Sequence, residues 1–187
     1  GLSSACIEGM TASSASCVAV MDADFQHDEA LLVPMLEALH GDALDIVVGS
    51  RYMKGGSTGE WDKRRRLMSR FATWLGRLLV RCDLTDPMSG FFMLRRDFFL
   101  RTVRGLSGKG FKILLDLCAS AAGPVRVKEL PYTFRSRRAG ESKLGAMVLW
   151  EYLSLLLDKS VGRWVPVRFF MFILVGLGGV VIHLTTL

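Results

Sequence analysis

The sequence lacks any paired arrangement of cysteines. Its four cysteines, Cys6, Cys17, Cys82 and Cys118, show neither a CxxC motif nor another regular spacing. A disulfide framework or a cysteine-based metal site is therefore not indicated, and we predict reduced, mostly buried thiols in a cytosol-like compartment. The sequence also has no internal repeat, so a solenoid is not expected.

Charged residues are missing from one stretch near the end of the chain. From Phe169 to Leu187 the sequence reads FFMFILVGLGGVVIHLTTL, without Asp, Glu, Lys or Arg. A helix of about 20 apolar residues spans a bilayer, and Arg163, Trp164 and Arg168 precede the run as interfacial anchors. We therefore predict the start of a transmembrane domain in residues 165–187. A buried core helix is the alternative.

Positive charge exceeds negative charge, with 24 Lys and Arg against 18 Asp and Glu and a net charge of +6. The excess is concentrated at Lys63–Arg66, Arg95–Arg96 and Arg135–Arg138. Such clusters suit nucleic acid, an anionic membrane surface or a phosphorylated small molecule, although a solvated surface is the simplest interpretation. Because the clusters accompany an apolar run, we expect a membrane and phosphate, and no nucleic acid.

Short apolar runs alternate with amphipathic segments along most of the chain. The runs that predict strands are Cys17–Met21, Leu44–Val48, Phe91–Leu94 and Val125–Phe134, the last broken at Pro131. The segments with helical spacing are Leu2–Ala15, Asp28–Leu39, Arg66–Val80 and Lys112–Ala122. This alternation predicts an α/β fold with a Rossmann-like, mostly parallel sheet whose strands are buried on both faces by flanking helices.

Two acidic residues, Asp22 and Asp24, directly follow the first apolar run. In an extended chain they would point to the same side, at the carboxyl end of a central strand, where open α/β sheets bind ligands. With the amide oxygen of Gln26 they suit a hard divalent cation such as Mg²⁺ or Mn²⁺. A DxD pattern alone is common by chance. Dehalogenase-type phosphatases also carry one, but they have Thr or Val where this chain has Gln26.

Several further motifs, which occur in a fixed order, help to decide which class of protein the DxD pattern belongs to. The chain carries, in sequence, VMDADFQH, IVVGSRYMKGG, KRRRLMSR, DPMSGFFMLRR, GFKILLDL and PYTFRSRRAGESKLG. This series closely resembles the dolichol-phosphate (polyprenyl-phosphate) mannosyltransferases among the family 2 glycosyltransferases, from Gly1 to about Tyr152. The resemblance implies an A-type glycosyltransferase fold. It also implies inverting transfer of a hexose, commonly mannose from GDP-mannose, to a dolichyl or undecaprenyl phosphate.

The resemblance also implies a metal site and a catalytic group. The family's metal motif falls on Asp22, Asp24 and Gln26, which would hold Mg²⁺ or Mn²⁺. Asp86 of DPMSGFF matches an acid beside the reacting sugar, so the expected catalytic residues are Asp24, Asp86 and Arg51. Because a phosphate monoester has a second pKa of about 6, the attacking phosphate is already largely deprotonated at neutral pH. Asp86 could therefore orient the sugar as well as act as a base.

Further positions match the parts of the family that bind phosphates. Arg51 of GSRY, with Arg65 and Ser69 of KRRRLMS, corresponds to the residues that grip the acceptor phosphate. Guanidinium groups suit this task because they bind phosphate oxygens in pairs. Arg137 and Lys143 of RSRRAGESK correspond to the loop that closes over the donor.

The resemblance also sets an expected organisation. The family's upstream strands, with PxYNE-like and DDGS-like segments, are not in this sequence, so we expect an N-terminally truncated catalytic domain at residues 1–143. Residues 144–164 would form an interfacial helix region, because Leu144–Leu157 is rich in Leu, Met, Trp and Tyr; a helix packed on the domain is the alternative. The basic residues before the apolar run place the catalytic domain at the cytoplasmic face of a membrane.

Two other functions stay open at this point. The same fold could transfer glucose or an amino sugar to undecaprenyl phosphate, because nothing in the sequence sets the hexose. The chain could also be a non-catalytic, membrane-anchored module that recruits partners through its basic face. Metal binding by Asp22 and Asp24 would distinguish an enzyme from such a module.

Overall fold

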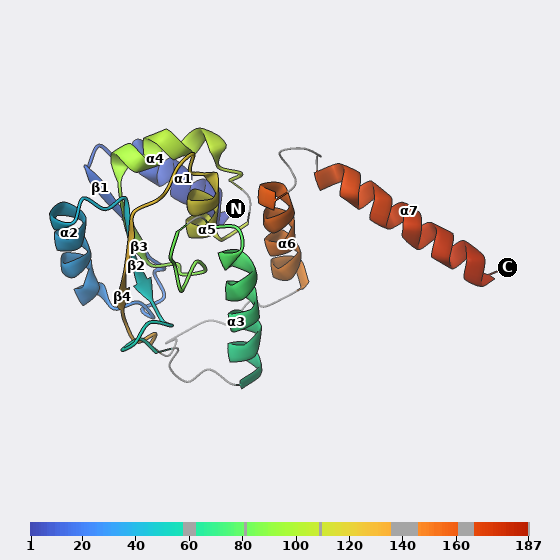
Figure 1. The fold of residues 1–187 in the computed structure, drawn as a ribbon, viewed down its shortest axis with the longest axis horizontal. Coiled ribbons are helices and arrows are strands. Elements are labelled where there is room, and N and C mark those ends of the chain that lie inside the picture. The colour runs from blue at the N-terminus through green and yellow to red at the C-terminus, as the bar shows by residue number, and fades with distance from the viewer. Residues whose placement is uncertain (58–62, 81, 109, 136–145, 161–166, 187) are drawn as a thin grey trace.

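The computed structural model describes residues 1–57, 63–80, 82–108, 110–135, 146–160 and 167–186 (Figure 1). The elements in chain order are α1 (Leu2–Ala12), β1 (Cys17–Val20), η1 (Glu29–Leu31), α2 (Leu32–Gly41), β2 (Ile46–Ser50), α3 (Lys63–Arg77), β3 (Phe92–Arg95), α4 (Arg96–Thr102), η2 (Val103–Gly105), α5 (Ile113–Ser120), β4 (Val127–Pro131), α6 (Ala146–Ser160) and α7 (Val167–Thr186). The predicted alternation of strands and helices is confirmed, with α4 as an additional helix.

The described strands form one sheet in the order β1-β3-β2-β4. β3 is antiparallel to both of its neighbours, and β2 is parallel to β4. The sheet is therefore mixed: β1, β2 and β4 run in one direction and β3 runs in the other, so the predicted mostly parallel sheet is confirmed only in part. The reason is that β3 begins where β2 ends, as the bond from Gly49 N to Phe91 O shows, and runs back between β1 and β2. β1 consequently lies at the edge of the described strands, although we expected a central position.

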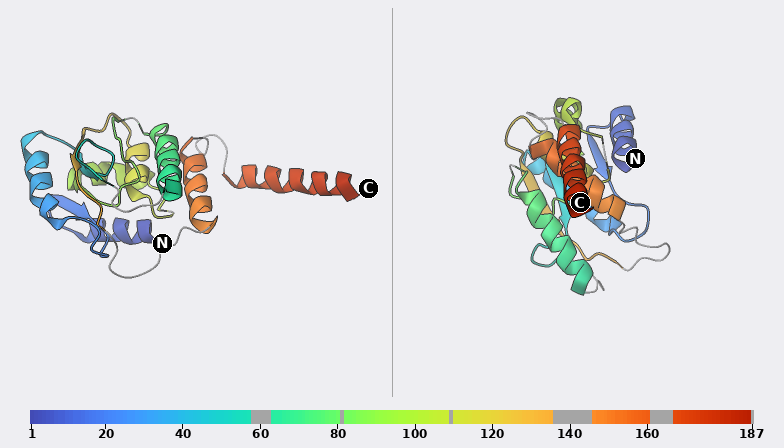
Figure 2. Two further views of the ribbon diagram at one scale, coloured as in Figure 1. Left: turned by 90° about the horizontal axis from the view of Figure 1, so that it is seen from below. Right: turned by 90° about the vertical axis from the view of Figure 1, so that its right-hand side faces the viewer.

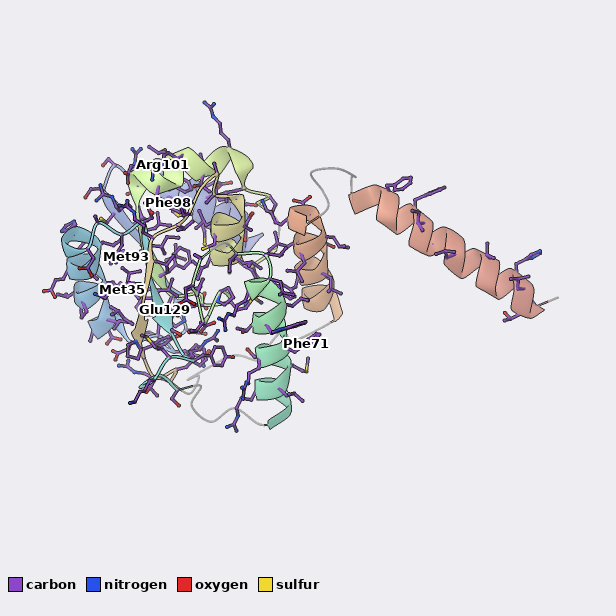
Figure 3. The ribbon with its side chains drawn as sticks, in the orientation of Figure 1. Met35, Phe71, Met93, Phe98, Arg101 and Glu129 are labelled. Carbon is purple, nitrogen blue, oxygen red and sulfur yellow. The ribbon has the colours of Figure 1, made fainter. Side chains whose placement is uncertain are left out.

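Alternate residues of the central strands face two separate apolar layers. Val47 and Met93 pack with Met35 and Leu39 of α2 on one face of the sheet (Figure 3). On the other face, α1, α4, α5 and α6 cover a larger core that includes the register partners Ile46 and Leu94. Continuous apolar runs are typical of strands buried on both faces, and this part of the prediction is confirmed.

The described part of α6 packs on the domain. Tyr152, Leu155 and Leu156 are buried in the larger core, and Tyr152 Oη donates a hydrogen bond of 2.6 Å to Ala72 O on α3. Lys159 Nζ lies 2.7 Å from the buried carboxylate of Asp116 on α5. These contacts match the alternative to an interfacial helix. They fix α3 and α6 against each other beside the sheet.

α7 extends away from the rest of the molecule (Figure 2). Several of its apolar side chains are exposed, among them Phe169, Phe172, Val175 and Leu184. Within the described residues, no helix combines the length and the apolar character that crossing a bilayer requires. The predicted membrane-spanning segment is therefore not confirmed. Its expected anchors Arg163 and Trp164 lie outside the described residues.

Candidate active site

A buried ion pair lies where β2 ends. Arg51 directly follows the strand, and its Nε and Nη2 donate hydrogen bonds of 2.7 and 2.8 Å to the two carboxylate oxygens of Asp86. The Asp86 side chain is 0% exposed and that of Arg51 is 9% exposed. Burial alone would lower the pKa of Arg51, but the hydrogen bonds and charge of Asp86 outweigh it and the pKa is raised. The guanidinium therefore stays charged at this position.

Two aromatic rings lie over the guanidinium of Arg51, and one of them contacts a hydroxyl of α3. Its guanidinium carbon lies 5.6 Å from the ring centroids of both Tyr52 and Phe134, within the range of cation–π attraction. Tyr52 Oη donates a hydrogen bond of 2.8 Å to Ser69 Oγ on α3. The predicted partners Arg51 and Ser69 are thus brought to one site through Tyr52.

Glu129 of β4 positions the loop that carries Asp86 (Figure 3). Its carboxylate accepts hydrogen bonds from Thr85 N at 2.8 Å, Thr85 Oγ1 at 2.9 Å and Asp86 N at 3.0 Å. Thr85 Oγ1 also lies 2.9 Å from Ser50 Oγ at the end of β2. Glu129 was not predicted as a site residue, because a single acid within a strand pattern carries no distinguishing signal.

The metal motif is arranged differently from the prediction. β1 ends at Val20, the chain bends at residues 23–25, and Phe25 has a φ of 61°. Asp22 and Asp24 therefore lie beyond the strand, and the prediction that they share one side of it is wrong. Instead, Gln26 N donates a hydrogen bond of 3.1 Å to Asp24 Oδ1.

Gln26 and His27 hold this segment against the domain. Gln26 is buried, and its Nε2 donates a hydrogen bond of 2.9 Å to Arg135 O. His27 Nδ1 accepts a hydrogen bond of 3.1 Å from Asp22 N, and its ring stacks on Phe91 with centroids 5.0 Å apart. Burial lowers the pKa of His27, although the nearby carboxylates act in the opposite direction. A neutral imidazole thus fixes the backbone of Asp22, and this role of His27 was not predicted.

No group of three or more His, Cys, Asp or Glu side chains that could hold a metal ion occurs in the part of the chain that the structure describes. The predicted set consists of the two carboxylates of Asp22 and Asp24 and the amide of Gln26. Such a set leaves several coordination positions to water and substrate oxygens, as is usual for Mg²⁺. These residue types would suit a hard divalent cation whose remaining ligands come from water and substrate.

A cavity of about 980 Å³ opens beside Arg51. Its wall on α3 carries Arg66, Arg70 and Arg77, together with the ring of Trp74. Helical spacing places these arginines on one side of the helix. The predicted phosphate-binding residue of the KRRR cluster was Arg65, of which the structure describes only the backbone within α3. The predicted donor-loop residues Arg137 and Lys143 lie outside the described residues.

Comparison with known protein families identifies the class of protein. The family model described as "Glycosyl transferase family 2" matches residues 1–102, more than half of the chain. The chain belongs to this family, which confirms the resemblance inferred from the motifs.

Curated relatives match nearly the whole chain. It is 37% identical over 187 residues to the dolichol-phosphate mannosyltransferase of Pyrococcus furiosus, covering 98% of this chain and 51% of that protein. It is 36% identical over 178 residues to the dolichol-phosphate mannosyltransferase of Mycosarcoma maydis, covering 93% and 60%. The Saccharomyces cerevisiae protein of the same name is 35% identical over 179 residues, covering 92% and 66%. The chain thus spans about half to two thirds of the length of these relatives.

Solved structures share the fold at lower identity. Glucosyl-3-phosphoglycerate synthase from Mycobacterium tuberculosis, in complex with Mn²⁺, UDP-glucose and phosphoglyceric acid, matches with a TM-score of 0.54 and 22% identity. The match covers 85% of this chain and 54% of that one. The same enzyme in complex with UDP matches with a TM-score of 0.52 and 23% identity. This likeness shows a glycosyltransferase fold with a mixed sheet and flanking helices.

Proposed function

We propose that the protein transfers a hexose, most directly mannose from GDP-mannose, to the phosphate of a polyprenyl lipid. The observation that carries this proposal is the Arg51–Asp86 pair, which opens on a cavity lined by three further arginines. The curated relatives named dolichol-phosphate mannosyltransferase support the choice of sugar and acceptor.

The cavity suits the end of a lipid phosphate. Arg51 and the arginines of α3 offer several donors to anionic oxygens, and guanidinium groups bind such oxygens in pairs. Trp74 and Leu78 line the same cavity with apolar surface that is 56% and 66% exposed. A phosphate would thus meet the arginines while the first isoprene units contact these two side chains.

α3 carries the features of a helix that lies on a membrane surface. Its exposed apolar side chains Leu67, Phe71, Trp74 and Leu78 recur three or four positions apart, which places them in one stripe. The cavity arginines run beside this stripe, where they would meet anionic headgroups. We therefore assign the main membrane contact to α3, with further apolar surface on α7. The nucleotide sugar would reach the site from the cytoplasmic side.

Asp22, Asp24 and Gln26 would hold Mg²⁺ or Mn²⁺, which supplies positive charge to the diphosphate that leaves the donor. Arg137 and Lys143 would close over the same diphosphate. These three side chains would occupy only part of the coordination sphere of such a cation, and water and substrate oxygens would occupy the rest. The fold relative from M. tuberculosis was solved with Mn²⁺ and a nucleotide sugar.

The attacking phosphate needs little activation. Its second pKa of about 6 leaves it largely dianionic at neutral pH, so alignment and electrostatic stabilisation would supply most of the rate. Both carboxylate oxygens of Asp86 already accept hydrogen bonds from Arg51. Asp86 therefore acts through the position of Arg51 and the sugar, and proton abstraction is not its main task.

The test is a panel of nucleotide sugars with polyprenyl phosphate and Mn²⁺, using the intact protein in liposomes. We expect mannosyl transfer from GDP-mannose. In Arg51→Ala we expect KM for the lipid phosphate to rise by about tenfold or more, with a much smaller change in KM for the donor. Arg104→Ala removes an exposed arginine elsewhere and serves as the matched control. If only glucose or an amino sugar is transferred, that sugar takes the place of mannose in the proposed function. If no sugar is transferred, the result favours the non-catalytic module.

A further inference from the structure

Lys112 of the GFKILLDL motif lies at the active-site loop, where neither the motifs nor the proposed function gave it a role. It is the residue immediately before α5. Its Nζ donates a hydrogen bond of 3.3 Å to Met88 O, two residues after Asp86. It also lies 4.6 Å from the ring centroid of Phe111. Arg51 and Lys112 thus hold the same loop at two points, one through Asp86 and the other through Met88.

The charge of Lys112 is not neutralised by an ion pair. Within the described residues no carboxylate lies at ion-pair distance from its Nζ, and Asp86 is already occupied by Arg51. Burial, followed by repulsion from Arg51, lowers the pKa of Lys112 to about 8, and the more distant Asp86 and Asp22 only partly oppose this shift.

In another lysine of this protein, a carboxylate compensates the charge of the ammonium group. Lys159 is also half-buried, and its Nζ lies 2.7 Å from the carboxylate of Asp116. A cation that is partly removed from water costs free energy unless an anion faces it. The Lys159–Asp116 pair meets this requirement within the chain. For Lys112 no such carboxylate is found among the described residues, and its Nζ contacts only the Met88 carbonyl and the Phe111 ring in the contacts given above.

We propose that Lys112 is an anion-binding residue of the active site that contacts a phosphate group of a substrate. The phosphate could belong to the donor diphosphate or to the acceptor lipid, and in assigning it to these substrates the inference rests on the proposed function. The geometry supports it because a phosphate held by Arg51 would lie near Asp86, and Lys112 contacts the same loop two residues further on, at Met88 O. Lys112 would add a point charge with three donors, while Arg51 supplies a planar fork.

The experiment measures equilibrium binding of inorganic pyrophosphate and of inorganic phosphate to the intact protein in metal-free buffer. Pyrophosphate stands for the donor and phosphate for the acceptor, so the two anions distinguish the source. We expect Lys112→Met to weaken binding of at least one of them by about tenfold or more, and Lys112→Arg to stay within about threefold of the wild type. Lys128→Met, an exposed lysine on β4, should change neither.

Thermal unfolding separates this role from a structural one. Because Lys112→Met removes an unpaired charge, we expect it to melt at the wild-type temperature or above. Unchanged binding of both anions in Lys112→Met would overturn the inference, and so would a lower melting temperature or failure to fold. Competitive acetylation of the wild-type protein adds a second readout, in which pyrophosphate or phosphate should protect Lys112. If no nucleotide sugar acts as a donor but binding of pyrophosphate or phosphate still depends on Lys112, the proposed function fails and this inference stands.

Discussion

Glu129 and Thr85 are joined by two hydrogen bonds, from Thr85 N at 2.8 Å and from Thr85 Oγ1 at 2.9 Å. A third bond runs from Asp86 N to the same carboxylate at 3.0 Å. β4 therefore determines where the Asp86 loop lies, and Asp86 in turn determines where Arg51 lies. Both carboxylate oxygens of Glu129 accept hydrogen bonds from this loop, so we regard it as a positioning residue.

Glu129→Gln tests this relationship. The amide group can accept only through its oxygen, so at least one of the N–H donors of Thr85 and Asp86 faces an NH₂ group. Hydrogen bonds to a charged acceptor contribute about 1.5–3 kcal/mol each. We expect kcat of the intact protein to fall by about tenfold or more, with Glu129→Ala affected more strongly. Glu37→Gln on the exposed side of α2 is the matched control. Equal kcat in Glu129→Gln and the control would show that Glu129 does not position the loop.

The alternation of strands and helices could be predicted because it depends on local periodicity. Val47 and Met93 were recognised as strand residues from their apolar runs alone. The direction of β3 was not predictable, because it depends on pairing between residues far apart in sequence, such as Val47 and Met93 themselves. α4 was missed because it begins at Arg96, directly after β3, and leaves no linker.

In the candidate site, too, local motifs could be recognised, whereas contacts between residues distant in sequence could not be predicted. Arg51 was singled out from the GSRY motif, and its binding of phosphate stays a prediction. The bidentate contact between Arg51 and Asp86 could not be predicted, since 35 positions separate the two residues. For α6, the helical period was visible in the sequence, but the period does not say whether protein or lipid covers the apolar face. The hydrogen bond from Tyr152 to Ala72 O shows that protein covers part of it.

Gly90 approaches the carboxylate of Asp22 closely. A Cβ at Gly90 would lie 3.1 Å from Asp22 Oδ2, so Gly90→Ala requires that exposed carboxylate to move by a few tenths of an ångström. We expect the concentration of Mn²⁺ needed for half-maximal activity to rise by about threefold or more, because the proposed metal ligand is displaced. The melting temperature should change little. Gly123→Ala, where a Cβ meets nothing within 4 Å, is the control. An unaltered Mn²⁺ dependence would separate Asp22 from the metal site.

Lys159 and Asp116 connect α6 to α5, and their separation should destabilise the fold. Asp116 is fully buried and also accepts hydrogen bonds from Ser107 N at 2.9 Å and Ser107 Oγ at 2.8 Å. Removing one partner of a buried pair costs about 3–5 kcal/mol, and the remaining hydrogen bonds should keep Lys159→Met at the lower end. Urea unfolding of the intact protein measures this loss.

Two further variants control for the loss of a charge and for the pair itself. Lys128→Met breaks the exposed pair with Asp42 and should cost less than about 1 kcal/mol. Asp116→Asn combined with Lys159→Met removes the uncompensated carboxylate and should recover part of the stability. If Lys159→Met and Lys128→Met unfold at the same urea concentration, the pair does not secure α6.

The exposed stripe of α3 predicts where the domain touches a bilayer. Phe71 and Trp74 stack with ring centroids 5.9 Å apart, and together with Leu78 they present apolar surface next to the cavity arginines. If the stripe lies at the depth of the lipid headgroups, quencher-labelled lipids should reduce the fluorescence of Trp74 in the intact protein bound to anionic vesicles. The quenched component should disappear in Trp74→Phe.

Two added tryptophans in the Trp74→Phe background provide the matched comparison. Leu78→Trp on the stripe should restore quenching by the labelled lipids, whereas Val33→Trp on the exposed side of α2 should not. Arg70→Gln should weaken the preference for anionic vesicles, since each basic residue near the surface contributes about 1 kcal/mol. A polyprenyl phosphate could then remain in the bilayer while its phosphate reaches Arg51. Equal quenching at positions 78 and 33 would mean that α3 does not face the lipid, and the acceptor would have to approach by another route.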